Sequence, residues 1–359
     1  MRGALIAGLW ALTLALSASA QPERLAVDQH AVMAENPPAL LSAYHFFADA
    51  SARTPNAGVT AYDLNTTLYS DGALKFRYLY LPPGAHASYR EDGVFDLPVG
   101  AVLIKTFAFA PDMRAPGEEM RFLETRLLIH LASGWIALPY VWNAAQTEAR
   151  LSAIGAIVPI DFTSDQGSAT HLDWAVPNTN QCKGCHDSAG AITPIGPTAR
   201  NLNRDIVYGS AAENQLAHWL NAGMLDRLPA DAPHFASAYD PASGTLDERA
   251  RAYLQVNCAH CHNPSGPAHT SGLDLRYSQI DPAARGVLKR PVAAGRGSAD
   301  LSFDIAPGHP EQSILLNRMQ STEPGEMMPE LGRTLVDQRA IALMREWIAD
   351  MGPDGRPKR

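Results

Sequence analysis

A chain of 359 residues, of which 46% are hydrophobic, is long enough to form two or three domains with packed cores. Its formal net charge is −8 at pH 7 and its sequence contains no basic patch, which excludes nucleic acid as an expected partner. An acidic surface suits instead a partner protein with a basic docking face.

The N-terminus has the layout of a secretory signal peptide. Arg2 precedes an apolar run over residues 4–16, and residues 18–20 (Ala-Ser-Ala) supply the small side chains of a cleavage site. The run is shorter than the roughly 20 apolar residues of a membrane span, which favours cleavage over an uncleaved anchor. We therefore expect residues 1–20 to be removed, and a periplasmic chain without an integral membrane segment to begin at Gln21.

Residues 21–169 show the two-residue periodicity of β-strands. The segments with this pattern are KFRYLYL, GAVLIKTFAF, FLETRLLIHL and WIALPYVW, and residues 132–134 separate the last two as a hairpin turn. Short strands punctuated by proline and glycine indicate an antiparallel β-sandwich or barrel-like domain. Lys105, Glu124 and Arg126 are interpreted as the solvated side of half-buried strands, with a binding face as the alternative.

All four cysteines lie in two copies of one pentapeptide, CKGCH at 182–186 and CAHCH at 258–262. In an exported chain, disulfides, a redox-active CxxC or zinc would each account for paired cysteines, but none requires histidine at the next position. Covalent haem does, because the thiols add to the haem vinyl groups and the histidine binds the iron. We therefore expect two haem c groups, attached through Cys182, Cys185, Cys258 and Cys261, with His186 and His262 as the proximal iron ligands.

The second motif is flanked by further features of a c-type haem domain. The segment 245–248 (Thr-Leu-Asp-Glu) predicts a capping box that opens a helix running into Cys258, and Asp337 begins a second helix. Between them, PGEMMPELGR contains Met328 followed by proline. We predict Met328 as the distal ligand of the second haem, with Met327 as the alternative. Ordinary core packing is the competing interpretation of both methionines.

Other polar residues near the second motif receive different interpretations. His260, inside CAHCH, is not expected to bind iron, because His262 occupies the required position. Arg296 or Arg333 is a candidate partner for a haem propionate, since the arginine fork suits a carboxylate, and an exposed surface position is the alternative for each.

The first motif lacks a preceding helix, because HLDWAVPNTNQ has no helical period and contains proline. After the motif, the segment 210–213 (Ser-Ala-Ala-Glu) predicts a capping box for a helix over NQLAHWLNAG. Met224 is the only methionine between the two motifs, so it is the predicted distal ligand of the first haem. His218 and His234 compete with it.

Over residues 170–353 the chain resembles a family of exported two-haem c-type cytochromes of unassigned physiological role, and its C-terminal part resembles a class I cytochrome c domain. The segments behind this resemblance are GPTARNLNRD, ENQLAHW, RAYLQVNCAHCHNPSG, PVAAGRGSAD, DIAPGHPEQSIL and MMPELGR. The resemblance implies electron transfer. It also implies that the carbonyl of Pro197, in a glycine-proline turn, orients the proximal imidazole of the first haem.

The expected architecture is multidomain and α+β. After the signal peptide (1–20), an antiparallel β-sandwich or barrel-like domain (21–169) precedes two mostly α-helical haem domains, an atypical one (170–243) and a class I-like one (244–359). The expected function is outer-sphere electron transfer with redox partner proteins of the periplasm. One alternative is a haem enzyme, peroxidase-like or acting on another small molecule, with an open or weakly ligated first haem. Another is a docking module whose β domain recognises a partner dehydrogenase.

Overall fold

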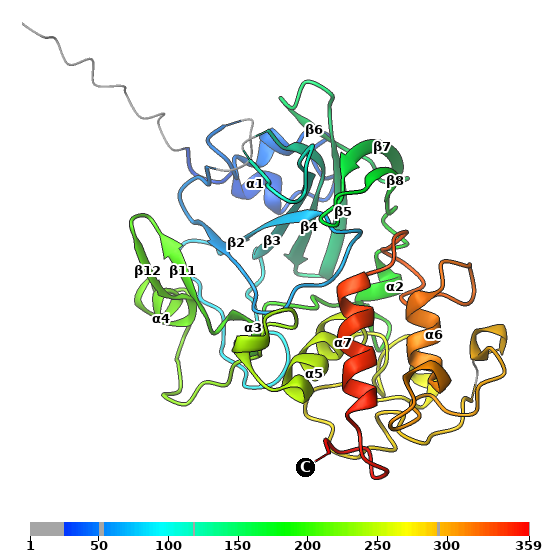
Figure 1. Cartoon of the computed structure of the whole chain (residues 1–359). Coiled ribbons are helices and arrows are strands. Elements are labelled where there is room, and N and C mark those ends of the chain that lie inside the picture. The colour runs from blue at the N-terminus through cyan, green and yellow to red at the C-terminus, as the bar shows by residue number, and fades with distance from the viewer. Residues whose placement is uncertain (1–24, 50–53, 118, 293–294, 359) are drawn as a thin grey trace, which may run out of the picture.

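The computed structural model describes residues 25–49, 54–117, 119–292 and 295–358. The expected signal peptide lies outside the described residues. Strands dominate the N-terminal half of the described chain, and the longest helices gather in the C-terminal part (Figure 1).

The centre of the N-terminal half is a six-stranded antiparallel sheet whose strands follow one another in sequence order. The pairing of Leu131 with Gly134 confirms the hairpin turn predicted between the third and fourth of the segments listed above. The strands are β1 (Val59–Tyr62), β2 (Leu74–Tyr80), β3 (Val102–Phe109), β4 (Arg121–Leu131), β5 (Gly134–Trp142) and β6 (Ala149–Leu151).

One face of this sheet is covered by the segment that precedes it. Phe76, Tyr78 and Tyr80 belong to this face, as their alternation predicts, and they pack with Tyr44 and Phe46 in one apolar cluster. The covering segment contains helix α1 (Gln29–Val32) and the 3-10 helix η1 (Leu41–Tyr44).

The opposite face is covered by a segment that follows the first CxxCH motif. Leu79 and Leu103 of the sheet form a buried cluster with Leu202, Leu216 and Trp219. These residues lie on α3 (Ala199–Leu202) and α4 (Gln215–Asn221). Both faces of the sheet are therefore buried, so the charged residues of its strands need partners other than bulk water.

A two-stranded hairpin, β7 (Ala156–Thr163) and β8 (Ala169–Val176), packs beside β3 and β4. Its aromatic rings make the contact, with Phe109 and Phe162 centred 4.6 Å apart and Phe107 and Trp174 5.3 Å apart. The chain leaves β8 and reaches the first motif without an intervening helix, which confirms that prediction.

The capping box predicted at 210–213 is wrong. Gly209, with a φ of 63°, and Ser210 form the two-residue turn of a hairpin, so residues 211–214 pair with residues 205–208. Helix α4 begins after Asn214, whose side chain accepts hydrogen bonds from the next turn. The elements of this region are α2 (Lys183–His186), β9 (Asp187–Ser188), β10 (Ala191–Ile192), α3, β11 (Asp205–Tyr208), β12 (Ala211–Asn214) and α4.

The C-terminal part has its own apolar core, built mainly from two helices of twelve residues, α5 (Leu246–Asn257) and α7 (Gln338–Ala349). The capping box of Thr245 with Glu248 and the N-cap of Asp337 are confirmed. Trp347 donates a hydrogen bond from Nε1 to Asp247 across the two helices. The remaining elements are η2 (Pro241–Ser243), η3 (His269–Ser271), η4 (Gly295–Ser298), η5 (Pro310–Gln312) and α6 (Ile314–Gln320).

The expectation of two mostly α-helical haem domains is wrong. The described residues form a six-stranded sheet, three two-stranded sheets and only seven α-helices, all short. The segment after β8 shows the reason. Helices α2, α3 and α4 have only four to seven residues, and the buried apolar side chains of α3 and α4 pack against the large sheet.

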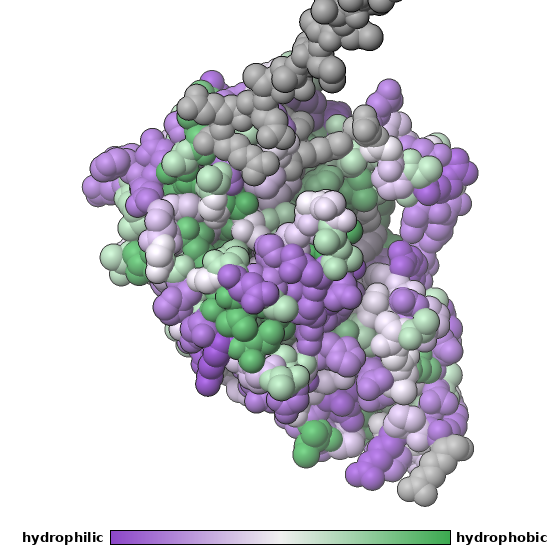
Figure 2. Space-filling model, turned by 90° about the vertical axis from the view of Figure 1, so that its left-hand side faces the viewer, coloured by the Kyte–Doolittle hydropathy of each residue, from purple (hydrophilic) through white to green (hydrophobic). Residues whose placement is uncertain are grey.

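The face of the molecule that lies on the left of Figure 1, beside β11 and β12, is largely hydrophilic (Figure 2). Its apolar side chains gather in small groups between polar ones. Scattered exposed apolar residues are ordinary on a protein surface, so this face indicates no particular docking site.

Candidate functional site

Each CxxCH motif lines a cavity of its own. Cys182, Cys185 and His186 line a cavity of about 280 Å³, which is bounded by the strands β3–β5, the end of α5 and residues 329–332. This first cavity therefore lies between the large sheet and the C-terminal helical part.

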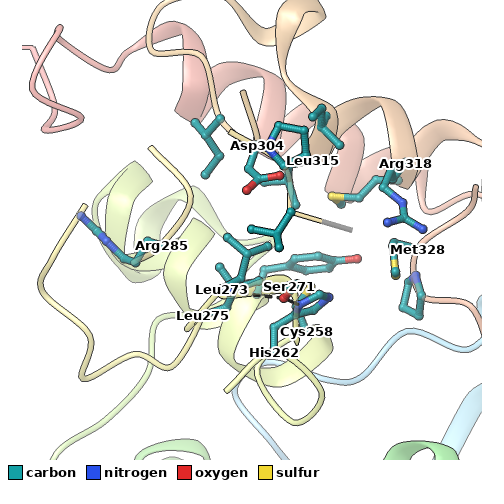
Figure 3. A pocket seen from close by; sticks show the side chains of 17 residues that line it. Cys258, His262, Ser271, Leu273, Leu275, Arg285, Asp304, Leu315, Arg318 and Met328 are labelled. Carbon is teal, nitrogen blue, oxygen red and sulfur yellow. Dashed lines mark hydrogen bonds between the residues drawn. The ribbon is translucent and has the colours of Figure 1, made fainter. Parts of the chain in front are cut away.

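Cys258 and His262 line a second cavity, of about 90 Å³, inside the C-terminal part. Met328 lines the same cavity, so the structure brings together His262 and the methionine that the sequence predicts as its partner (Figure 3). Most of the other lining side chains are apolar, including Leu273, Leu275 and the ring of Tyr253.

The imidazole of His186 is held in one tautomer by a backbone carbonyl. Its Nδ1 lies 2.9 Å from the oxygen of Thr193, which can only accept, so Nδ1 donates and Nε2 keeps its lone pair. This arrangement is typical of histidines that bind metals. The predicted orienting carbonyl, that of Pro197, instead accepts a hydrogen bond from the backbone of Phe95. The prediction for Pro197 is therefore wrong.

His262 is oriented in the same sense by a serine. Its Nδ1 lies 3.0 Å from Oγ of Ser271 (Figure 3), and that hydroxyl donates its own proton to the carbonyl of Ala268 at 2.7 Å. Ser271 therefore accepts from His262, and Nε2 of His262 is left as the unprotonated nitrogen. Both proximal candidates are thus prepared to bind through Nε2.

The thiol pKa values argue against a redox-active dithiol. Burial raises the pKa of Cys258 and of Cys261 to about 12, and it raises the pKa of Cys182 and Cys185 as well. A redox-active thiol requires the opposite shift. All four cysteines are free thiols in the structure.

Arg333 stabilises the loop that carries Met328. It is 6% exposed, and its Nε and Nη2 donate to the carbonyl of Met328 at 3.1 and 2.8 Å. Nη2 also donates to the carbonyls of Met319 and Ser321. Arg296 lies on the surface, with a side chain that is 80% exposed.

Another arginine is better placed to meet an anionic group at the second cavity. Arg285 lines this cavity, and its buried Nε has no hydrogen-bond partner among the described residues. Arg318 lines the cavity too, but its Nε already donates to the carbonyl of Glu326. Neither arginine stood out in the sequence, because neither belongs to a motif.

The structure does not bring Met224 together with His186. Met224 packs in the cluster between α4 and the sheet, where its sulfur accepts a hydrogen bond from Thr60 at 3.3 Å. Of the two competing histidines, His218 pairs with Glu213 and stacks on Tyr208. The described residues that line the first cavity include neither Met224 nor His218 nor His234.

The first cavity contains an unusual row of cations. Arg77, Lys105 and Arg126 lie directly opposite one another on β2, β3 and β4, and all three line the cavity. Arg77 pairs with Asp63 at 3.3 Å, and Arg126 pairs with Glu124. Like charges that face each other across strands are destabilising, so this row indicates an anionic ligand.

Lys105 is the unpaired member of this row. It has no carboxylate partner among the described residues, and burial lowers its pKa well below the ordinary value. Glu124 is fully buried, where it accepts hydrogen bonds from Arg126 and Trp174. The interpretation of Lys105, Glu124 and Arg126 as a solvated strand face is therefore wrong.

His260 also lines the first cavity, although it belongs to the second motif. Burial, together with the charges of His186 and His262, lowers its pKa to about 4. Its Nδ1 is buried and has no hydrogen-bond partner among the described residues. Sequence reasoning set this residue aside.

The two motifs touch each other. Sγ of Cys261 lies 3.7 Å from the carbonyl oxygen of Gly184, and the backbone of Ala189 donates to the carbonyl of Ser265. A Cβ atom at Gly184 would lie 2.5 Å from Cδ1 of Leu331, so the exposed side chain of Leu331 would have to shift to admit a larger residue there.

The donor sets fit two haem c groups. The first cavity offers the thiols of Cys182 and Cys185, and the second offers that of Cys258. Each also offers an imidazole with a free Nε2 and cationic side chains for carboxylates. Within the described ranges, no group of three His, Cys, Asp or Glu side chains forms a metal site by itself. No helix in the same ranges has the length and apolar character needed to cross a bilayer. Comparisons with protein-family models, with curated proteins and with solved structures found no match.

Proposed function

We propose that this protein is an exported two-haem c-type cytochrome that transfers electrons between redox partner proteins of the periplasm. The observation that supports this proposal most directly is the contact between the two CxxCH motifs, each of which lines its own cavity. The bound iron would supply a one-electron couple between the ferric and ferrous states.

The chain's own residues would hold the haem groups, bind their iron and keep the two sites close together. The four cysteines would hold two haem groups by thioether bonds, and His186 and His262 would bind iron through Nε2. Met328 would complete the second site, where Arg333 fixes the backbone of its loop. The contact between Gly184 and Cys261 would keep both haem groups close enough for electrons to pass between them.

The cations of the first cavity would bind the haem carboxylates. Arg77 and Arg126 already have carboxylate partners, whereas Lys105 has none among the described residues. A haem carboxylate would therefore stabilise Lys105 more than it would stabilise either arginine. Burying a lone cation is costly, and an anionic ligand offsets this cost.

We therefore expect Lys105→Met to have opposite effects in two forms of the protein. In protein made without haem attachment, the substitution should raise the free energy of unfolding by about 1 kcal/mol, because it removes a cation that faces two others. In haem-loaded protein it should lower this free energy. Denaturant titrations of both forms measure the two changes.

Lys75→Met is the matched control, since Lys75 is another half-buried lysine of the same sheet and is not among the described residues that line the cavity. Lys75→Met should change the free energy of unfolding by the same amount in the haem-free and the haem-loaded protein. A Lys105→Met protein that is stabilised equally with and without haem would contradict the assignment of Lys105 to the haem carboxylates.

A redox titration of the full-length protein, followed by absorbance, tests the proposed function. We expect two reversible one-electron steps, two haem equivalents and no turnover of added peroxide. Sustained peroxide turnover would favour the haem enzyme, and an absence of haem would rule out both. Recovery of a bound dehydrogenase from the native host would support the docking alternative.

A further inference from the structure

We infer that His260 is the distal ligand of the first haem iron, so that the loop holding the second haem also completes the first site. This inference rests on the proposed function, because it requires a haem at Cys182 and Cys185.

The first argument is the direction in which the loop after α5 presents its side chains. Cys258 and His262 line the second cavity, whereas His260, between them, lines the first. The turn that produces this division is held by the backbone, since the amides of Cys261 and His262 both donate to the carbonyl of Cys258. One pentapeptide therefore faces two cavities.

The second argument is that, within the described ranges, the buried imidazole of His260 has an unsatisfied ring nitrogen. A buried polar atom without a partner is costly and calls for an explanation, and Nδ1 of His260 is such an atom among the described residues. By contrast, His218 has Glu213 as a partner. A metal ion bound to the imidazole would explain why this polar ring is buried.

The third argument is the set of alternatives in the first cavity. The described residues that line it include no methionine, and the remaining side chains able to bind iron are Tyr62, Tyr69 and Lys105. Burial raises the pKa of both phenols, which keeps them protonated. Lys105 lies in the cation row of the sheet, where an anionic carboxylate suits it better than iron does.

The consequence is a difference between the two sites. The first would have two histidine ligands and the second a histidine and a methionine, and a methionine ligand raises the potential of haem iron. Electrons would then pass from the first site to the second. Two strong ligands would also close the first iron to peroxide.

The wild-type protein supplies the first test. Electron paramagnetic resonance of the ferric form should show two low-spin signals, one typical of two histidine ligands and one typical of histidine with methionine. A high-spin signal, or two signals of the histidine-methionine type, would overturn the inference. A mass spectrum that lacks the first haem would instead contradict the proposed function.

Substitution supplies the second test. In His260→Ala, half of the haem iron should lose its wild-type low-spin signal, while the thioether band of the second haem at the red edge of the visible remains. In His260→Met, the thioether band should approximately double. An unchanged spectrum in either variant, with both haem groups attached, would overturn the inference.

Met224→Ala is the matched control, because it removes a competing candidate ligand that does not line the first cavity and leaves His260 in place. It should keep the wild-type low-spin signals. If Lys105→Ala produced the high-spin iron while His260→Ala did not, Lys105 would be the ligand and the inference for His260 would be wrong.

Discussion

Replacing Cys182 and Cys185 by serine is expected to remove one covalently bound haem from the matured protein and to leave the other attached. Cys182 and Cys185 line the first cavity and Cys258 lines the second, so the loss of the first pair removes both thioether bonds at one site only. The mass of protein extracted with acid-acetone should exceed that of the polypeptide by two haem groups in the wild type and by one in this variant.

The reciprocal variant, with serine at Cys258 and Cys261, is the control. It should retain the haem of the first motif, although its iron would be disturbed because His260 lies in the altered segment. Wild-type protein that contains zinc, or two free dithiols without haem, would contradict the central proposal.

Replacing Met328 by alanine is expected to remove the thioether absorption band from one haem. It is also expected to lower the reduction potential of that haem by about 0.1 V. Met328 lines the cavity of His262, and a methionine ligand favours the ferrous state. Axial ligands set haem potentials over a range of about 0.8 V, so a shift of this size is measurable. Absorbance during a redox titration reports both changes.

Met327→Ala is the matched control, since Met327 belongs to the same loop but is not among the described residues that line the cavity. It should leave the band and both potentials unchanged. If Met327→Ala abolished the band and Met328→Ala did not, the alternative ligand would be correct.

Arg333→Lys should weaken the thioether band in part, because a lysine cannot reproduce the several hydrogen bonds that hold the loop.

Features that depend on neighbours in the sequence were predicted well. The alternation of β2, the hairpin between β4 and β5, and the capping box of α5 all involve residues within a few positions of one another. The capping box expected at 210–213 failed for a reason of the same kind. Gly209 and Ser210 fit a two-residue hairpin turn, and strand pairing then used the residues that the helix would have needed.

The proposed distal ligand of the first haem shows the limit of this reasoning. Met224 was the only methionine available along the chain, but α4 packs against the sheet and its sulfur meets Thr60 instead of a cavity. His260 was set aside because its neighbour His262 had the required spacing. Spacing predicts which residue lies beneath the haem of its own motif, and it cannot reveal that an adjacent side chain faces another site.

The sequence by itself determined the two CxxCH motifs, the four strands β2 to β5 of the sheet and the two helices of the C-terminal part, because spacing, alternation and caps are local properties of the chain. Only the tertiary structure decided that the segment after the first motif packs on the sheet, that Arg77, Lys105 and Arg126 face the first cavity, and that the two motifs touch. These features depend on which surfaces bury one another, and burial is set by contacts between residues far apart in the chain.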